Sequence, residues 1–293
     1  MKVFLTGGTG TLGKAIIKRF HEKWDIVSYS RDELKLSQLE REYPKVKFVI
    51  GDIKDYPALE KAMKGANAVI HAAAMKRIEV CEAFPFEAVK TNILGTENVV
   101  RAVLNNGIKR AVVTGSDKGV EATTAYGMTK ALQEKIFVNN DFNCVRYGNV
   151  FGSRGSVAPL FADQAKRGLP LTVTHPEMTR FLLTINDAVD LVVLALRSPM
   201  DGSIFVKKSS AARLIDIASA FSDNIIVTGK TKGEKLHEML INSEEFTRLK
   251  KVTGSMVAIG KKATTTKYGE PLTSDRAKLL SVEEIKHLIK KCL

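Results

Sequence analysis

The sequence predicts an α/β protein in which a doubly wound parallel sheet is joined to a smaller C-terminal lobe. Three observations support this fold class. An apolar segment at residues 1–5 leads into a glycine-rich loop, strand and helix patterns then alternate to residue 114, and 293 residues suffice for one large domain with an added lobe. Such βαβ order requires right-handed crossovers and helices on both faces of the sheet. We therefore expect a Rossmann-like domain over residues 1–150 and a lobe, interleaved with it, over residues 151–293.

The first element is an apolar strand, and the loop after it reads T-G-G-T-G-T-L-G before a helical pattern at residues 14–20. Gly7 permits a tight turn, Gly10 lets the backbone approach a pyrophosphate, and Gly13 lets helix and strand pack closely. Free N–H groups at the helix N-terminus attract phosphate. The loop is therefore predicted to bind a dinucleotide through Gly7, Thr9, Gly10, Thr11, Leu12 and Gly13.

The end of the second strand pattern indicates which dinucleotide to expect. It reads Ser30-Arg31, where an enzyme that uses NAD commonly has an acidic residue for the ribose hydroxyls. Arg31, with Lys35 one helical turn later, instead suits a 2′-phosphate. Asp32 and Glu33 are near enough in sequence to reach a ribose. NADP is the predicted cofactor, with contacts from Ser30, Arg31 and Lys35, and NAD is the alternative.

The following elements continue the alternation. Strand patterns at residues 46–52, 68–74 and 109–114 are separated by helical patterns at residues 57–64 and 86–106. The third strand ends where the adenine ring lies in such a sheet. The fourth ends in small residues that let the nicotinamide ribose approach. These two positions are predicted to complete the cofactor site with Asp52, Ile53, Ala72, Ala73 and Ala74.

Two catalytic patterns follow the fifth strand. Ser116, Asp117 and Lys118 stand directly after its end, where clefts form in α/β proteins. Tyr126 precedes Lys130 by four residues, so a helix places both on one face, where they are also expected to contact the cofactor. The ammonium is expected to draw the tyrosine pKa down from about 10, toward a value useful for a general base. A tyrosine base serves alcohol oxidation, whereas the added Asp-Lys pair indicates elimination.

The chain resembles the extended short-chain dehydrogenases/reductases, and among them the soluble, inverting UDP-N-acetylglucosamine 4,6-dehydratases. The resemblance covers most of residues 1–240, in collinear order. The matching segments are T-G-G-T-G-T-L-G from Thr6, Y-S-R-D-E-L-K from Tyr29, H-A-A-A-M-K from His71, K-T-N-I-L-G-T-E-N-V from Lys90, S-D-K from Ser116, Y-G-M-T-K from Tyr126, R-Y-G-N-V-F-G-S-R-G-S-V from Arg146, M-T-R-F from Met178 and G-E-K-L-H-E from Gly233.

This resemblance implies a reaction on a UDP-sugar with tightly bound NADP that is recycled within each turnover. Tyr126, paired with Lys130, would take the proton of the C4 hydroxyl, and Ser116 would bond the C4 oxygen. Lys118 would remove the C5 proton, Asp117 would protonate the departing C6 hydroxyl, and C5 would be reprotonated from the opposite face. The expected product is a UDP-4-keto-6-deoxy-hexosamine for surface glycan biosynthesis.

The resemblance also implies a substrate site that draws on the second half of the chain. Asn149 and Arg180 are expected to contact the diphosphate, and Arg154 with Ser156 opens a helix whose N–H groups suit the same anion. The predicted substrate-binding residues are Lys76, Asn92, Asn149, Arg154, Ser156, Arg180 and Glu234. Asn92 lies inside a long helix, where its amide is expected to support the structure more than the chemistry.

Composition restricts the partners and the compartment. The net charge of +13 suits steering of a dianionic nucleotide sugar, and no pattern typical of nucleic-acid recognition accompanies it. Three cysteines without metal-type spacing predict a reducing compartment and no metal site. No apolar run approaches the ~20 residues of a membrane span, and the first residues enter a strand directly, so neither a membrane segment nor a signal peptide is expected. We expect a cytoplasmic homo-oligomer, either a dimer or a hexamer.

Two alternatives would use the same glycine loop. A nucleotide-sugar epimerase or reductase would need Tyr126 and Lys130, but not Asp117 and Lys118 as an acid/base pair. A non-enzymatic NADP sensor would keep the loop and typically lose the tyrosine. Because all four residues are present, the sequence favours the dehydratase.

Overall fold

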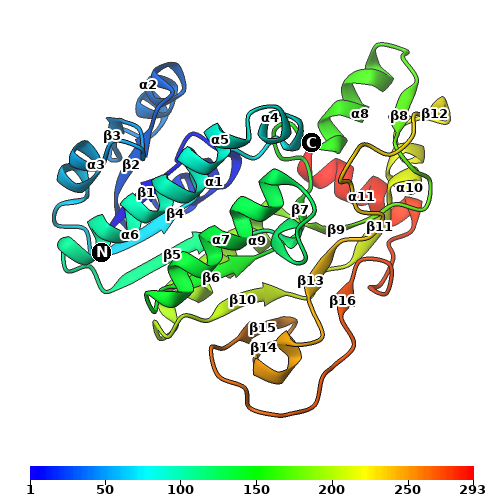
Figure 1. Ribbon diagram of the computed structural model, residues 1–293. Helices are drawn as coiled ribbons and strands as arrows, with labels where there is room; N and C mark the ends of the chain where they lie inside the picture. Colours follow the sequence, from blue (N-terminus) through cyan, green and yellow to red (C-terminus); the bar gives the residue numbers. More distant parts are fainter.

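The computed structural model describes residues 1–293, apart from the side chain of Lys251. Strands and helices alternate through its first half, and the second half combines mostly short strands with several longer helices (Figure 1). Along the chain they are β1 Lys2–Thr6, α1 Thr11–Phe20, β2 Asp25–Ser30, α2 Glu33–Glu42, β3 Lys47–Ile50, α3 Tyr56–Met63, β4 Ala68–His71, α4 Ile78–Ala83, α5 Pro85–Ala88, η1 Val89–Leu94, α6 Gly95–Asn105, β5 Arg110–Thr114, η2 Asp117–Gly119, α7 Ala125–Asn139, β6 Asn143–Arg146, β7 Asn149–Val150, α8 Val157–Lys166, β8 Leu171–Val173, β9 Thr179–Leu183, α9 Ile185–Arg197, β10 Ile204–Lys207, β11 Ala211–Arg213, α10 Leu214–Ser219, β12 Ile225–Val227, β13 Met239–Ile241, η3 Glu245–Arg248, β14 Leu249–Thr253, β15 Met256–Ile259, β16 Leu272–Thr273 and α11 Val282–Cys292.

The main sheet has nine strands in the order β14-β15-β10-β6-β5-β4-β1-β2-β3. The strands from β3 to β10 in this order are parallel, and β15 and β14 extend the sheet by antiparallel pairing. The chain winds outward from β1 in both directions, which is the doubly wound topology. The predicted fold class is therefore confirmed.

Helices cover both faces of this sheet (Figure 1). On one face, α1, α2 and α9 pack against the strands through residues such as Ile16 and Leu39. On the other face, α3, α6 and α7 pack through residues such as Leu59 and Phe137. Because β1 is covered on both sides, its apolar residues are buried without alternation, as expected for a central parallel strand.

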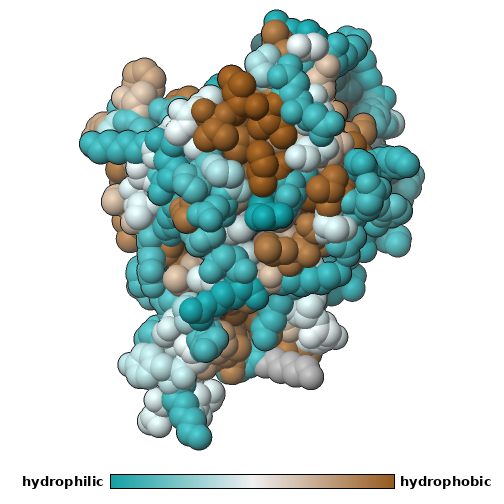
Figure 2. Space-filling model, turned by 90° about the vertical axis from the view of Figure 1, so that its right-hand side faces the viewer, coloured by the Kyte–Doolittle hydropathy of each residue, from teal (hydrophilic) through white to brown (hydrophobic). Residues whose placement is uncertain are grey.

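A third apolar core belongs to the lobe beside the sheet. Phe161 of α8, Leu171 of β8, Ile217 of α10 and Ile285 of α11 are fully buried in it. Small sheets of order β11-β9-β7, β12-β8 and β13-β16 complete this region. Figure 2 views the face that carries the lobe and shows a group of apolar side chains in its upper part.

Two local features differ from a simple alternation of strands and helices. The helix predicted over residues 86–106 is divided into α5, the π-helical turn η1 and α6. Three strands from the second half, β10, β14 and β15, return to the main sheet. The boundary at residue 150 stays a prediction. Within the described part of the chain, no helix is both long enough and apolar enough to cross a membrane.

Candidate functional site

Most of the predicted site residues follow the carboxyl ends of neighbouring parallel strands. The glycine loop follows β1, residues 72–74 follow β4, Ser116 follows β5 and Asn149 follows β6. Since these strands are parallel and adjacent, their carboxyl ends lie at one edge of the sheet, where ligands bind in open α/β folds. The fold thereby brings together segments from across the first half of the chain.

The glycine loop leaves no space for side chains at two positions. A Cβ atom on Gly13 would lie 2.5 Å from the Gly7 carbonyl oxygen and from the Gly8 Cα atom. Gly7 has a φ of +74°, and a Cβ there would lie 2.8 Å from the Ala73 nitrogen. The helix α1 then begins without a side-chain cap at Gly10. This close-packed loop before an uncapped helix N-terminus fits the pyrophosphate of a dinucleotide.

The two cations predicted for a 2′-phosphate differ in their surroundings. Arg31 is exposed, and its Nη1 atom lies 3.5 Å from Asp52 Oδ2. Lys35 is paired with Asp32, whose side chain also accepts a hydrogen bond from the Lys35 backbone at the start of α2. Arg31, directly after β2, is therefore more loosely paired with a carboxylate than Lys35 in α2.

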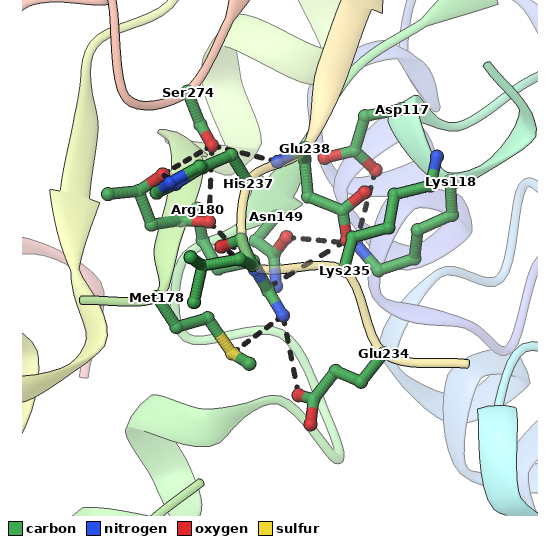
Figure 3. Close-up of polar contacts among 12 residues, drawn as sticks. Asp117, Lys118, Asn149, Met178, Arg180, Glu234, Lys235, His237, Glu238 and Ser274 are labelled. Carbon is green, nitrogen blue, oxygen red and sulfur yellow. Dashed lines mark hydrogen bonds and ion pairs between the residues drawn. The ribbon is translucent and has the colours of Figure 1, made fainter. Parts of the chain in front are cut away.

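An acid and base cluster lies after β5 (Figure 3). Lys118 Nζ is 3.2 Å from each of three oxygens: Asp117 Oδ1, Asn149 Oδ1 and Glu238 Oε1. Asp117 and Glu238 are 1% and 3% exposed. Glu238 was not among the predicted site residues, because 120 residues of sequence separate it from Lys118. The G-E-K-L-H-E motif that contains it is the signal that could have identified it.

Burial and mutual charge shift the pKa values of this cluster. Burial raises the pKa of Asp117 and the Glu238 charge adds to this, while Lys118 opposes it. For Lys118, burial alone would lower the pKa, but the Asp117 and Glu238 carboxylates raise it above its ordinary value. The Glu238 pKa is lowered, because Lys118, Arg180 and Lys235 outweigh the effect of burial. Asp117 is thus suited to hold a proton and Glu238 to carry a charge.

The Tyr126 and Lys130 side chains have separate environments. Burial raises the pKa of Tyr126, and the Lys118 charge and a Ser116 hydrogen bond oppose the shift. Lys130 instead donates to the Thr114 carbonyl and to Gln133 Oε1, and burial lowers its pKa to about 8. The expectation that Lys130 lowers the tyrosine pKa is wrong for this structure. Lys118 is the cation that acts on Tyr126.

Three segments meet through Lys76 and Arg154. Lys76 Nζ donates to the Arg154 carbonyl at 2.6 Å, and the Arg154 N–H donates to Thr11 Oγ1 at 3.2 Å. Ser156 stands at the N-cap of α8, with a buried hydroxyl that has no partner within the described residues. The loop before α8 thus lies against the glycine loop, and its helix N-terminus is open to an anion.

The remaining predicted residues are bonded to protein groups. Arg180 is buried, with Nη2 3.3 Å from Glu234 Oε1 and Nε 3.8 Å from Glu238 Oε1, so both Arg180 and Glu234 belong to the acid and base cluster. Asn92 is fully buried in η1, and its amide bonds both backbone groups of Met75. Asn92 thereby fixes the loop that carries Lys76.

Comparisons with known proteins show the family and the fold of the chain. Residues 3–259 match a family model described as polysaccharide biosynthesis protein. A UDP-glucose 4-epimerase of Rickettsia rickettsii (strain Sheila Smith) is 39% identical over 322 residues, which cover 98% of this chain and 94% of that protein. The X-ray structure of Pen from Bacillus thuringiensis superposes with a TM-score of 0.93 at 33% identity, over 100% of this chain and 98% of the other.

A more distant structure has the same fold. DesIV, a dTDP-glucose 4,6-dehydratase from Streptomyces venezuelae solved with NAD and TYD bound, has a TM-score of 0.74 at 19% identity, over 80% of this chain and 87% of its own. From the family match and the relatives that align over nearly its whole length, the chain belongs to the polysaccharide biosynthesis protein family, within the superfamily of nucleotide-sugar dehydratases and epimerases.

Proposed function

We propose that this protein is a nucleotide-sugar 4,6-dehydratase that acts on UDP-N-acetylglucosamine, inverts C5 and uses NADP. The observation that carries the proposal is the buried Asp117-Lys118 pair beside Tyr126, because alcohol oxidation alone needs no second acid and base. The raised pKa of Asp117 favours its protonated form, which is the form that a general acid requires.

Three side chains, Tyr126, Lys118 and Asp117, would each move one proton. Tyr126 removes the proton of the C4 hydroxyl while Ser116 bonds the C4 oxygen. Once C4 is a ketone, the C5 proton is acidic, and Lys118 would take it after its ammonium, the favoured form beside the two carboxylates, has released a proton to solvent. Asp117 protonates the C6 hydroxyl, so that the C6–O bond breaks, water leaves and a C5=C6 double bond forms. Reprotonation of C5 from the opposite face completes the inversion.

The binding residues follow from the same geometry. The glycine loop and residues 72–74 would hold the dinucleotide, with Arg31 at its ribose end. When bound, its nicotinamide supplies a hydride acceptor for C4 and a hydride donor for C6. The open N-terminus of α8, with Arg154 and Asn149, would bind the substrate diphosphate.

NMR of the sugar during incubation in deuterated water tests the proposal. Purified protein with UDP-N-acetylglucosamine and no added reductant should form a 4-keto-6-deoxy sugar that carries deuterium at C5. The configuration at C5 reports inversion. Recovery of unchanged UDP-N-acetylglucosamine would refute this substrate, and turnover of a different nucleotide sugar would identify the correct one.

A second candidate is a UDP-sugar 4-epimerase, favoured by the name of the Rickettsia relatives, which are up to 39% identical to this chain. Such an enzyme would convert UDP-glucose into its C4 epimer without solvent deuterium at C5. The Asp117→Asn variant separates the two candidates. It should slow dehydration by about 10²-fold or more, whereas epimerisation at C4 would continue because it needs no acid at C6.

The proposed preference for NADP predicts the effect of removing the Arg31 charge. In Arg31→Ala, the Kd for NADP⁺ should rise by about tenfold or more, since a charge-assisted contact to the 2′-phosphate is lost. The Kd for NAD⁺ should stay constant. Isothermal titration of both nucleotides checks this, with Arg41→Ala, at the far end of α2, as the control. Equal weakening of both nucleotides would contradict it.

A further inference from the structure

The contacts of Lys118 indicate a role for Glu238, an inference that rests on the proposed function. The ammonium of Lys118 has three N–H donors, and three oxygens lie 3.2 Å from it, on Asp117, Asn149 and Glu238 (Figure 3). Every donor therefore has an acceptor within the protein. Lys118 is held in place from η2, from β7 and from the segment before β13.

Two carboxylates contact the Lys118 ammonium. Asp117 and Glu238 are both buried, and each has one oxygen without a hydrogen-bond partner among the described residues, Asp117 Oδ2 and Glu238 Oε2. Two ionised carboxylates beside one ammonium repel each other in a buried site, where water screens their charges little. Such a pair holds a proton on one member and the charge on the other.

The surrounding charges decide which member is ionised. Glu238 faces Lys118, Arg180 with its Nε atom at 3.8 Å, and Lys235. Asp117 contacts Lys118 and accepts a hydrogen bond from the Ser116 hydroxyl at 3.1 Å; it also lies within the field of Lys235, but it has no ion pair with Arg180. Tyr126 and Glu234 are the other ionisable groups at the cluster, and Glu234 is paired with Arg180. The negative charge is therefore better stabilised on Glu238.

We propose that Glu238 is a positioning residue whose carboxylate holds Lys118 and carries the negative charge of the cluster, which leaves Asp117 as the protonated acid. Asp117 can then give its proton to the C6 oxygen without first taking one from solvent. Glu238 acts through its two neighbours and contacts no reacting atom. The raised pKa of Asp117 and the lowered pKa of Glu238 agree with this division.

The charge division can be measured on the protein alone, without substrate. Protein labelled with ¹³C at the aspartate carboxyl carbon is titrated by NMR, and Asp117→Asn identifies the Asp117 signal. In Glu238→Gln, which keeps the shape and removes the charge, the Asp117 midpoint should move to lower pH. In Glu238→Asp, which keeps the charge, it should stay near the wild-type value. Identical midpoints in wild type and Glu238→Gln would overturn the proposal.

Glu234→Gln is the matched control. Glu234 lies in the same motif as Glu238, but its carboxylate contacts Arg180 and not Lys118. In this variant the Asp117 titration midpoint should equal that of the wild type, even if the rate of sugar turnover changes. Circular dichroism of each variant confirms that it is folded. If the Asp117 midpoint shifts as far in Glu234→Gln as in Glu238→Gln, the effect comes from the total charge of the site, and the specific role of Glu238 is refuted.

The kinetic consequence is tested with the sugar. The pH profile of UDP-N-acetylglucosamine dehydration should move to lower pH in Glu238→Gln, with kcat reduced by roughly tenfold or more, because both Asp117 and Lys118 lose a negative neighbour. A residue with a merely structural role would lower the rate and leave the profile in place. If the NMR midpoint shifts but no sugar is dehydrated, the proposed function fails and the charge division stands.

Discussion

At the scale of single residues, burial decides which side chains around the site are charged. His71 is fully buried in β4, with its ring nitrogens bonded to Thr6 Oγ1 and Thr96 Oγ1 at 2.7 and 3.0 Å. Burial, with the nearby Lys130 charge, lowers its pKa to about 3. Gln133 bonds both Thr96 and Lys130, so one polar network joins these buried groups. The histidine is therefore neutral at physiological pH.

The low pKa of His71 makes stability depend on pH. Between its ordinary pKa of 6.5 and its folded value of about 3, the unfolded chain binds a proton that the folded chain does not. Stability is therefore lost as the pH falls, by about 1.4 kcal/mol per pH unit from this residue. In His71→Asn, urea unfolding between pH 6.5 and 4.5 should show a shallower fall than in wild type. The exposed control His287→Asn should keep the wild-type slope, and equal slopes in all three proteins would contradict the prediction.

Asp117 gives the sharpest prediction for a single side chain. Its replacement by Asn removes the proton that the C6 hydroxyl needs, so dehydration should slow by about 10²-fold or more. The amide preserves the volume of a residue that is 1% exposed, so folding should be retained. Steady-state rates check this, with Asp163→Asn on the exposed face of α8 as the control. If Asp117→Asn dehydrates the sugar at a rate within about threefold of wild type, Asp117 is not the acid.

At the scale of elements, the junctions between strands and helices shape the site. The β1–α1 loop is packed so closely that a Cβ on Gly13 would lie 2.5 Å from backbone atoms of both Gly7 and Gly8, whereas a Cβ on Gly10 would meet only the Gly7 carbonyl oxygen, at 3.2 Å. The π-helical turn η1 brings Asn92 to the backbone of Met75. Loop conformation, rather than residue type alone, thus determines where the site residues lie.

Gly13 and Gly10 of this loop should respond differently to replacement by alanine. Gly13→Ala should lower the free energy of unfolding by about 1–3 kcal/mol, because the added Cβ would overlap backbone atoms that cannot move aside. Gly10→Ala should keep most of the stability but weaken dinucleotide binding, because the methyl group occupies the approach to the pyrophosphate. Thermal unfolding with and without nucleotide separates these effects. The reverse pattern would contradict this account of the loop.

At the scale of the whole molecule, a buried arginine joins the sheet to the C-terminal half. Arg146 of β6 is 3% exposed and lies 2.5 Å from Glu134 of α7 and 2.8 Å from Glu245 of η3. It also donates to the Leu240 carbonyl in β13 at 2.8 Å. Through β13 this network reaches the segment that carries Glu238, so the acid and base cluster depends on contacts between distant parts of the chain.

Breaking this network should destabilise the whole protein. Glu245→Gln removes one of the two carboxylates that bond Arg146, while Glu134 still pairs with it, and the expected loss is about 1.5–3 kcal/mol in the free energy of unfolding. The adjacent Glu244→Gln, which removes an exposed ion pair with Arg248, should cost less than about 1 kcal/mol. Urea unfolding followed by circular dichroism compares the two. Equal losses would show that the buried network contributes no more than a surface pair.

Local patterns in the sequence determined the doubly wound sheet, the glycine loop and the positions of Asp117, Lys118, Tyr126 and Lys130, because each depends on residues that are neighbours along the chain. Tertiary structure decided the rest. Pairing with Lys118 across 120 residues makes Glu238 part of the cluster, and burial raises the Tyr126 pKa where helical spacing predicted the reverse. Desolvation and long-range charge interactions depend on which residues pack around a group in the folded protein. The order of residues along the chain does not give the distances between such groups.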